Sequence, residues 1–371
     1  MFNISNSRIL HRIDLPLIIA VSILVLIGIV IIGSATHINT PGSERYWYVQ
    51  RQGIFALVGA LIVFLMMKFD YRVLQHLGNK LYIFNVLMLF AVDIAGHSAL
   101  GAQRWIQIGP ISFQPSEFSK LIMIISLAVL LENRVGKLNT FKELLPVTLY
   151  LIVPFFLVVT QPDLGTALVF LAIFFGMIFA AGVNMKLIGI IFGIGLSCLP
   201  VFWHFLKEYQ KMRMMVFINP NIDPLGSGYH IIQSKIAIGS GLLYGKGLFH
   251  GTQSQLNFLP ENHTDFIFAV IGEETGFIGA TIVLLIFLFI LWRGIRIARE
   301  ASDNLGMLLA VGMTSMLAFH VLVNIGMTIG IMPVTGIPLP FISYGVSSLI
   351  TNIMGMGLLL NIYNNRQQLI F

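Results

Sequence analysis

The segment LPLIIAVSILVLIGIVIIGS, residues 15–34, decides the fold class of this chain. It contains no charged side chain, and its length matches the roughly 20 residues that an α-helix needs to cross a bilayer. A secretory signal has a shorter apolar part and is removed, whereas here Ser34 and Ala35 lead on towards another apolar segment. We therefore expect the segment to be retained as a membrane-spanning helix.

Similar apolar segments recur along the whole chain. Hydrophobic residues make up 57% of its 371 residues and charged residues only 10%, a balance that excludes a soluble domain with an ordinary surface. The sequence predicts an all-α, polytopic integral membrane protein with a single domain, residues 1–371. We count about ten transmembrane helices, at residues 15–34, 54–67, 81–95, 118–131, 145–159, 164–181, 187–205, 266–292, 307–332 and 349–363.

Basic residues predict the orientation, because Lys and Arg near the ends of spans stay on the cytoplasmic side. Most of them fall in the N-terminal segment, which holds Arg8 and Arg12, and in every second connection after it. The short outer loops carry only Arg45, Arg51 and Arg104. We expect a multi-pass protein of the cytoplasmic (inner) membrane with both termini in the cytoplasm. The net charge of +6 then follows from topology, and we expect no nucleic-acid partner.

One connection is much longer than the others. It covers residues 206–264, between the seventh and eighth spans, and it lies on the predicted extracytoplasmic side. Loops of this length are usually functional or disordered, and its many apolar residues argue against disorder. Helical spacing over residues 229–240 predicts a short interfacial helix. The GKG stretch at residues 245–247 lacks the spacing of a phosphate-binding loop, so we expect its glycines to permit tight turns and close backbone approach.

Polar residues gather in four clusters near the ends of spans, at residues 101–120, 161–166, 260–268 and 272–276. An ionisable side chain within a membrane costs about 2.5 to 3.5 kcal/mol and usually faces a cavity or a partner. By the predicted orientation, the first three clusters meet on the outer side of the membrane. Their convergence predicts an extracytoplasmic functional site.

The first cluster combines a helix start with two outer-loop residues. The PS dipeptide at residues 115–116 is typical of a first helical turn, which places Glu117 and Lys120 one turn apart on the same face. The two side chains form either a structural ion pair or part of a substrate site. Arg104 could bind phosphate oxygens, and Trp105 could contact a sugar face or anchor the loop at the interface.

The second and third clusters supply acidic candidates. Asp163 either complements the dipole of the helix that follows it or belongs to the site. Asp265 precedes the apolar run 266–270, where a low dielectric would raise its pKa towards a value useful for a general base. The alternative is a capping aspartate. Glu261 and His263 could tune Asp265, bind a metal, or be ordinary loop residues.

Further polar residues lie deeper in the predicted spans. Glu273 and Glu274 are adjacent, so we expect only one of them to face the bundle interior. His320 and Asn324 are four residues apart, and we expect them to form interhelical hydrogen bonds. The proline-rich last outer loop, residues 333–348, is expected to be a re-entrant segment packed against protein.

Four stretches together resemble the SEDS family of peptidoglycan glycosyltransferases. They are GAQRWIQIGPISFQPSEFSK, QPDLGTALV, the long block from DPLGSGYH to GEETG, and PLPFISYGVSS. The resemblance covers nearly the whole chain, and it implies that Asp265, in the HTDFIF motif, is the essential acid of the family. Val346 departs from the family pattern, which usually has two glycines after SY. The other functional motif positions fall on Trp105, Glu117, Lys120 and Asp163.

The resemblance implies an enzyme that polymerises lipid II at the outer face of the cytoplasmic membrane, for cell elongation and rod shape. Asp265 would take a proton from the acceptor sugar while polyprenyl diphosphate leaves. Lys120, Arg104 and a divalent cation, Mg²⁺ or Mn²⁺, could stabilise the developing charge. Expected partners are lipid II, lipid-linked glycan, membrane lipids, a class B penicillin-binding protein transpeptidase and other elongation-complex proteins. A lipid II flippase and a noncatalytic scaffold for a transpeptidase are the alternatives.

Overall fold

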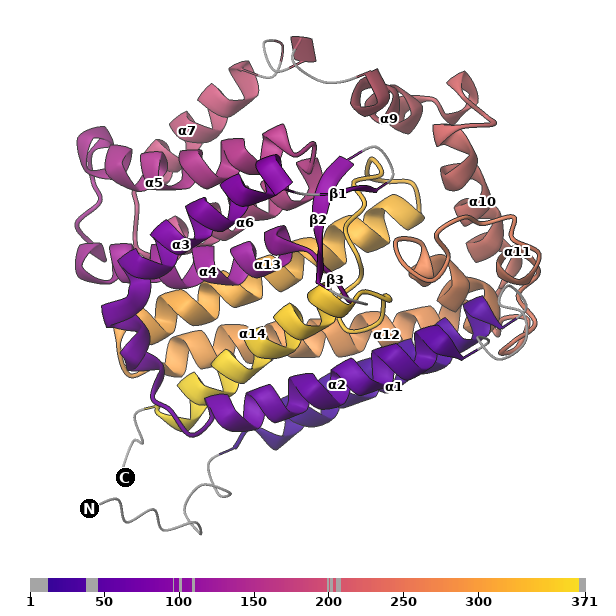
Figure 1. Cartoon of the computed structure of the whole chain (residues 1–371), viewed down its shortest axis with the longest axis horizontal. Helices are drawn as coiled ribbons and strands as arrows, with labels where there is room; N and C mark the ends of the chain where they lie inside the picture. The colour runs from indigo at the N-terminus through magenta and orange to yellow at the C-terminus, as the bar shows by residue number, and fades with distance from the viewer. Residues whose placement is uncertain are drawn as a thin grey trace.

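The computed structural model describes residues 13–37, 46–95, 97–99, 102–108, 111–198, 200, 203–204 and 208–366. Ten helices of this part overlap the ten predicted spans (Figure 1), and part of the seventh span, residues 187–205, lies outside the described residues. They are α1 (Leu15–Thr36), α2 (Trp47–Met66), α3 (Leu74–Ala95), α4 (Pro115–Leu131), α5 (Phe141–Thr160), α6 (Leu164–Ala180), α7 (Met185–Ser197), α12 (Ile267–Glu300), α13 (Asn304–Thr328) and α14 (Val346–Asn364).

The helices confirm a multi-pass membrane protein. Six of those described are long and apolar enough to cross a membrane, namely α1, α2, α5, α12, α13 and α14, and α6 and α7 are shorter apolar helices. The count of ten spans therefore stays a prediction. Within the most apolar part of each helix, 67% of the residues of α13 and 78% of those of α14 are buried. In α2 the share is only 11%. The core of the bundle thus lies around α13 and α14, with α2 at its edge.

Local sequence signals set several helix starts. Asp14 accepts a hydrogen bond from the backbone of Leu17 and caps α1, whose first turn contains a proline. Pro115 stands in the first turn of α4, and the side chains of Thr140 and Glu143 form a capping box at the start of α5. At α1 and α5 a side chain satisfies backbone N–H groups that have no partner within the helix, and at α4 the proline removes one such N–H group.

The long connection is more helical than expected. It contains α9 (Glu208–Ile218), η5 (Pro220–Ile222), α10 (Ser227–Ser240) and α11 (Thr252–Gln255). Helix α10 confirms the short helix predicted over residues 229–240. The 3₁₀ helices η3 (Tyr71–Val73) and η4 (Glu132–Arg134) lie at turns between the longer helices.

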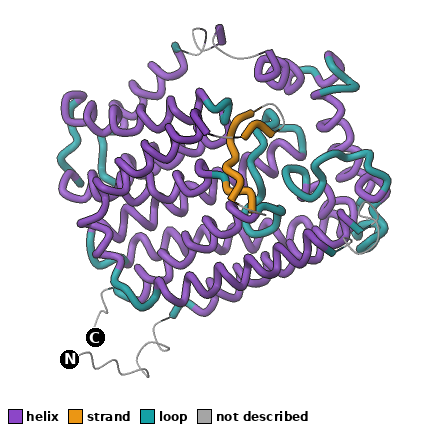
Figure 2. The backbone as a smooth tube through the Cα atoms, viewed as in Figure 1, coloured by secondary structure: helices purple, strands orange, loops and turns teal. Residues whose placement is uncertain are grey.

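A small antiparallel sheet stands where an irregular outer loop was expected (Figure 2). Its strands are β1 (His97–Ala99), β2 (Ala102–Ile108) and β3 (Ile111–Phe113), in the order β1-β2-β3. Trp105 pairs with His97, and Ile106 pairs with Phe113. The run WIQI within β2 is rich in residues that favour strands, so the otherwise all-α fold carries a short sheet directly before α4.

Helix α12 is interrupted at Gly276, where φ is 67° and ψ is −165°. Residues 242–247 of the long connection fill the break: Lys246 N and Gly247 N donate to the carbonyls of Glu273 and Glu274, each at 3.0 Å. On the other side of the break, the N–H groups of residues 277 and 278 donate to the carbonyls of residues 242 and 243, at 2.9 and 3.2 Å. The span predicted over residues 266–292 therefore forms as α12 but carries an interruption that its sequence did not indicate, and a loop distant in sequence satisfies the freed backbone groups.

Candidate active site

The pair Glu117–Lys120 lies at the head of α4. Lys120 Nζ is 2.7 Å from Glu117 Oε1, and the two side chains are 2% and 5% exposed, which confirms the predicted ion pair. Lys120 Nζ also lies 3.0 Å from His320 Nε2 of α13. Glu117 Oε2 is buried without a hydrogen-bond partner among the described residues. Lys120 thus joins α4 to α13. Beside it, Glu117 Oε2 accepts no hydrogen bond from the described residues.

Asp163 caps α6 and contacts α4. Its side chain accepts hydrogen bonds from the backbone N–H of Thr166 at 3.2 Å and from the Thr166 hydroxyl at 2.9 Å. Ser116, in the first turn of α4, donates to the same carboxylate at 3.1 Å. The capping role considered from the sequence is therefore confirmed, and the carboxylate also holds the heads of α6 and α4 together.

Asp265 lies on the turn before α12 and is half-buried. The cap position of α12 is Phe266, so Asp265 is not the capping aspartate of the alternative interpretation. The side-chain amide of Asn324, on α13, donates both to the Asp265 carbonyl at 2.9 Å and to the Ile337 carbonyl at 2.8 Å. A Cβ added to Gly336 would lie 3.5 Å from Asp265 Oδ2. The backbone of the last outer loop therefore passes beside the Asp265 carboxylate.

The last outer loop holds this turn in place. Ser343 Oγ donates to the Thr264 carbonyl at 2.7 Å, and Tyr344 N donates to the His263 carbonyl at 2.9 Å. Just beyond these residues, the first turn of α14 meets the start of α4, where Gln114 N donates to Ser347 Oγ at 3.1 Å. Buried apolar residues of the loop pack within the bundle, as expected of a segment beside protein: Ile337, Leu339, Phe341 and Ile342.

Glu261 and His263 lie on the same turn as Asp265. Glu261 is exposed and accepts a hydrogen bond from the Thr264 hydroxyl at 2.7 Å. The ring of His263 packs 4.9 Å from that of Tyr48 and 5.9 Å from that of Tyr344, between ring centroids. Burial lowers the pKa of His263, and the nearby Glu261 opposes this only in part. His263 is therefore held as a neutral ring that supports the turn.

Trp105 and Arg104 lie on β2. The Trp105 side chain is half-buried, whereas the Arg104 side chain falls outside the described part of the structure. The last strand of the sheet ends at Phe113 and α4 begins at Pro115. The strand that holds Arg104 and Trp105 is therefore joined through β3 to the helix that holds Glu117.

Glu273 and Glu274 are both buried, at 0% and 1% exposed, and they lie on different faces of α12, as expected of an adjacent pair. Glu273 Oε1 lies 2.7 Å from Lys246 Nζ and accepts from the backbone N–H of Gln253 at 2.9 Å. Glu274 Oε1 accepts from the Ser34 hydroxyl of α1 at 2.5 Å. The long connection covers one face of α12 and α1 covers the other. Two adjacent glutamates in an apolar segment each require a partner, and this signal predicts that partners exist but not which segments supply them.

The described residues contain no group of three or more His, Cys, Asp or Glu side chains that could hold a metal ion. The acidic candidates are engaged separately: Glu117 with Lys120, Asp163 with Ser116, and Asp265 beside Gly336. A divalent cation, Mg²⁺ or Mn²⁺, shared with the substrate diphosphate stays a prediction, since Mg²⁺ commonly binds to one or two carboxylates together with substrate phosphates.

Comparisons with known proteins identify the family of the chain. The family of cell cycle proteins that comprises FtsW, RodA and SpoVE matches residues 15–368. The chain is 40% identical over 348 residues to the peptidoglycan glycosyltransferase MrdB of Escherichia coli K12, which covers 94% of each chain. It is also 40% identical over 354 residues to the stage V sporulation protein E of Bacillus subtilis 168, covering 94% of this chain and 96% of that one.

Solved structures show the same fold. One, described as the structural coordination of polymerization and crosslinking by a peptidoglycan synthase complex, has a TM-score of 0.81 at 34% identity and covers 96% of this chain and 99% of the other. The rod shape determining protein RodA of Thermus thermophilus has a TM-score of 0.71 at 31% identity, covering 96% and 98%. The chain belongs to the FtsW/RodA/SpoVE family of cell cycle proteins, the SEDS family that its motifs resemble.

Proposed function

We propose that this protein is a peptidoglycan glycosyltransferase that polymerises lipid II at the outer face of the cytoplasmic membrane. One observation carries the proposal. His320 and Asn324 are one turn apart on α13; the first contacts Lys120, and the second holds the backbone of Asp265. Four residues correspond to about 6 Å along a helix. Helix α13 thus contacts both the turn that contains Asp265, the proposed base, and the buried Lys120, at positions one helical turn apart.

The family supplies the reaction, and we assign its steps to these residues. The 4-hydroxyl of the acceptor N-acetylglucosamine attacks the anomeric carbon of the lipid-linked donor, and Asp265 accepts the hydroxyl proton. The bond between the anomeric carbon and the diphosphate oxygen breaks, so that polyprenyl diphosphate leaves with the electron pair. Lys120 and Arg104 stabilise the negative charge on the diphosphate, and Trp105 contacts a sugar ring. The remaining residues of the substrate site contact the substrate or position the residues that do: Glu117, Asp163, Glu261 and His263.

The cellular setting is part of the proposal. The distribution of Lys and Arg supports cytoplasmic termini and an extracytoplasmic site, and the likeness to MrdB and RodA favours a role in elongation. The likeness to a synthase complex that couples polymerization to crosslinking supports a class B penicillin-binding protein as partner. Lipid-linked glycan, membrane lipids and other elongation-complex proteins are the remaining proposed partners.

The decisive experiment is lipid II polymerisation by the purified full chain in liposomes, analysed by gel for glycan strands. Asp265→Asn should abolish polymer while its thermal unfolding stays like that of wild type. Asp70→Asn, an exposed carboxylate beside η3, is the matched control and should polymerise normally. Full activity of Asp265→Asn would refute the assignment. Exchange of lipid II between leaflets without any polymer would instead support a flippase, and inactivity without a competent transpeptidase would indicate a scaffold or an activated enzyme.

A further inference from the structure

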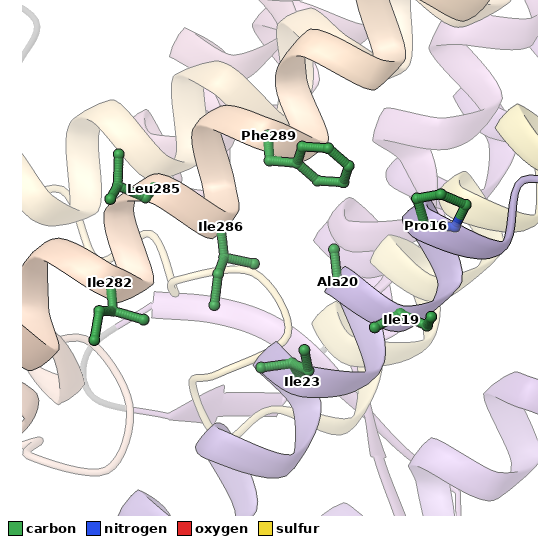
Figure 3. A pocket seen from close by; sticks show the side chains of 8 residues that line it. All are labelled: Pro16, Ile19, Ala20, Ile23, Ile282, Leu285, Ile286 and Phe289. Atoms are coloured by element: carbon green, nitrogen blue, oxygen red, sulfur yellow. The ribbon is translucent and has the colours of Figure 1, made fainter.

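A concave apolar groove of about 490 Å³ lies between α1 and α12 on the outside of the bundle (Figure 3). Pro16 and Ile23 line it from α1, and Ile282, Leu285 and Phe289 line it from α12. Ile23, Ile282 and Leu285 are 41%, 50% and 58% exposed. Within a membrane, the groove is therefore open to the surrounding lipid.

The α12 side of the groove continues as a stripe of exposed residues, from position 282 to position 299, whose side chains change from apolar to charged towards the end of the helix. Residues 282, 285, 289, 292, 296 and 299 follow one another at spacings of three or four, so they share one helical face. The rings of Phe289 and Trp292 lie 5.8 Å apart, and the Arg296 guanidinium lies 5.9 Å from the centre of the Trp292 ring. Trp292, Arg296 and Arg299 are exposed. The stripe thus passes from apolar to aromatic to cationic.

The length of the stripe matches one leaflet of a bilayer. Residues 282 to 296 span about 21 Å at 1.5 Å per residue. Half of a bilayer with its headgroup regions is roughly 20 to 22 Å thick. Acyl chains lying along Ile282 to Phe289 therefore bring a phosphate to the level of Arg296, with Trp292 at the depth that interfacial aromatic residues prefer.

The cationic end carries excess positive charge. Arg293 and Asp14 form a buried ion pair that joins α12 to the start of α1. Arg296 Nε lies 2.6 Å from Glu300, and Arg366 Nε lies 3.7 Å from the same carboxylate. Four arginines, at positions 293, 296, 299 and 366, and two carboxylates, at positions 14 and 300, belong to this end, so their charges sum to +2. This excess favours an anion at the end of the groove.

We propose that the groove binds one anionic phospholipid of the leaflet at which α1 begins and α12 ends. Its acyl chains occupy the apolar groove, and its phosphate contacts Arg296 and Arg299. Packing between transmembrane helices favours small residues, whereas this stripe is lined by large apolar and charged side chains. These features favour a lipid over a partner helix. The site lies apart from Asp265, which is at the opposite end of α12, and it is independent of the proposed reaction.

Fluorescence of Trp292 tests the proposal directly. The full chain with Trp47→Phe, Trp105→Phe and Trp203→Phe keeps Trp292 alone and is reconstituted in phosphatidylcholine vesicles. Brominated phosphatidylglycerol and brominated phosphatidylcholine are then added at equal mole fractions, since bromine quenches a nearby indole. We expect an apparent affinity about thirtyfold higher for phosphatidylglycerol, as for two basic contacts of about 1 kcal/mol each near an anionic surface.

Two variants separate the site from general attraction to the leaflet. Replacing both exposed arginines, Arg296→Gln and Arg299→Gln, should abolish the preference, whereas Lys142→Gln, an exposed lysine at the start of α5, should retain it. Equal quenching by the two lipids, or a preference that survives loss of both arginines, would overturn the proposal. Protection of Trp292 from both lipids would also overturn it, because another transmembrane chain would then cover the stripe.

Discussion

Replacement of Lys120 by methionine separates the two interpretations of the Glu117–Lys120 pair. The lysine ammonium is almost fully buried, at 2% exposed, and lies 2.7 Å from Glu117. Removing one partner of a buried pair leaves the other charge without compensation and costs roughly 3–5 kcal/mol. We expect Lys120→Met to lower the free energy of unfolding by about that amount, measured by thermal or SDS-induced unfolding in micelles.

The double variant Glu117→Gln/Lys120→Met removes both charges. Neutral replacement of a buried ion pair is often nearly neutral for stability, so most of the lost stability should return. Lipid II polymerisation should stay absent, because Lys120 is proposed to stabilise the leaving diphosphate. Wild-type polymerisation by the stable double variant would refute a role in the reaction and leave the pair purely structural.

The pair Glu208–Lys211 is a matched control at the same i,i+3 spacing. Its nitrogen and oxygen are 3.0 Å apart, but Glu208 is 89% exposed, and exposed pairs contribute at most about 1 kcal/mol. Lys211→Met should therefore change stability little. An equal decrease in the free energy of unfolding in Lys120→Met and Lys211→Met would show that burial of the pair is not the reason why Lys120 stabilises the fold.

Three further predictions concern the loops around the site. Gly276→Ala should unfold at a clearly lower temperature than wild type, because φ at Gly276 is 67° and the new Cβ would lie 2.3 Å from Gly245 N. Gly53→Ala is the control, because a Cβ at Gly53 would meet open space, and it should unfold at the wild-type temperature. Glu273→Gln should speed hydrogen exchange over residues 246–256, since it weakens the bond from Lys246; unchanged exchange would exclude this anchor. Because burial lowers the pKa of His263, the unfolded state binds its proton first, and stability should fall as pH drops below about 6.5. His263→Gln should flatten this dependence in pH-resolved unfolding, and an unaltered slope would exclude His263 as its source.

Hydropathy and local signals were enough to place most of the bundle. The apolar segments found in the sequence became helices, and Pro115 and Asp163 stand at the helix starts that their residue types indicate. The ion pair of Glu117 with Lys120 followed from spacing on one helix. Each of these features depends on residues within a few positions, which a sequence reports directly.

Features that depend on distant segments could not be predicted in the same way. The contact of Lys120 with His320 joins residues 200 positions apart. The burial of Glu273 and Glu274 requires both the long connection and α1. The break at Gly276 is stable only because another segment supplies the missing hydrogen bonds. The position of Asp265 beside the last outer loop likewise follows from Asn324 rather than from its own neighbours.

The interrupted helix α12 has a consequence for how the protein is made. The segment that fills the break, residues 242–247, precedes α12 in the chain, so the ribosome completes it first. When α12 enters the membrane, the backbone groups on either side of Gly276 would cost several kcal/mol each if left unpaired in hydrocarbon. Their partners have already been synthesised and lie next to them in the order of insertion. The first part of α12, which follows directly after Asp265, therefore depends for its backbone hydrogen bonds on a loop that the chain supplies before the helix.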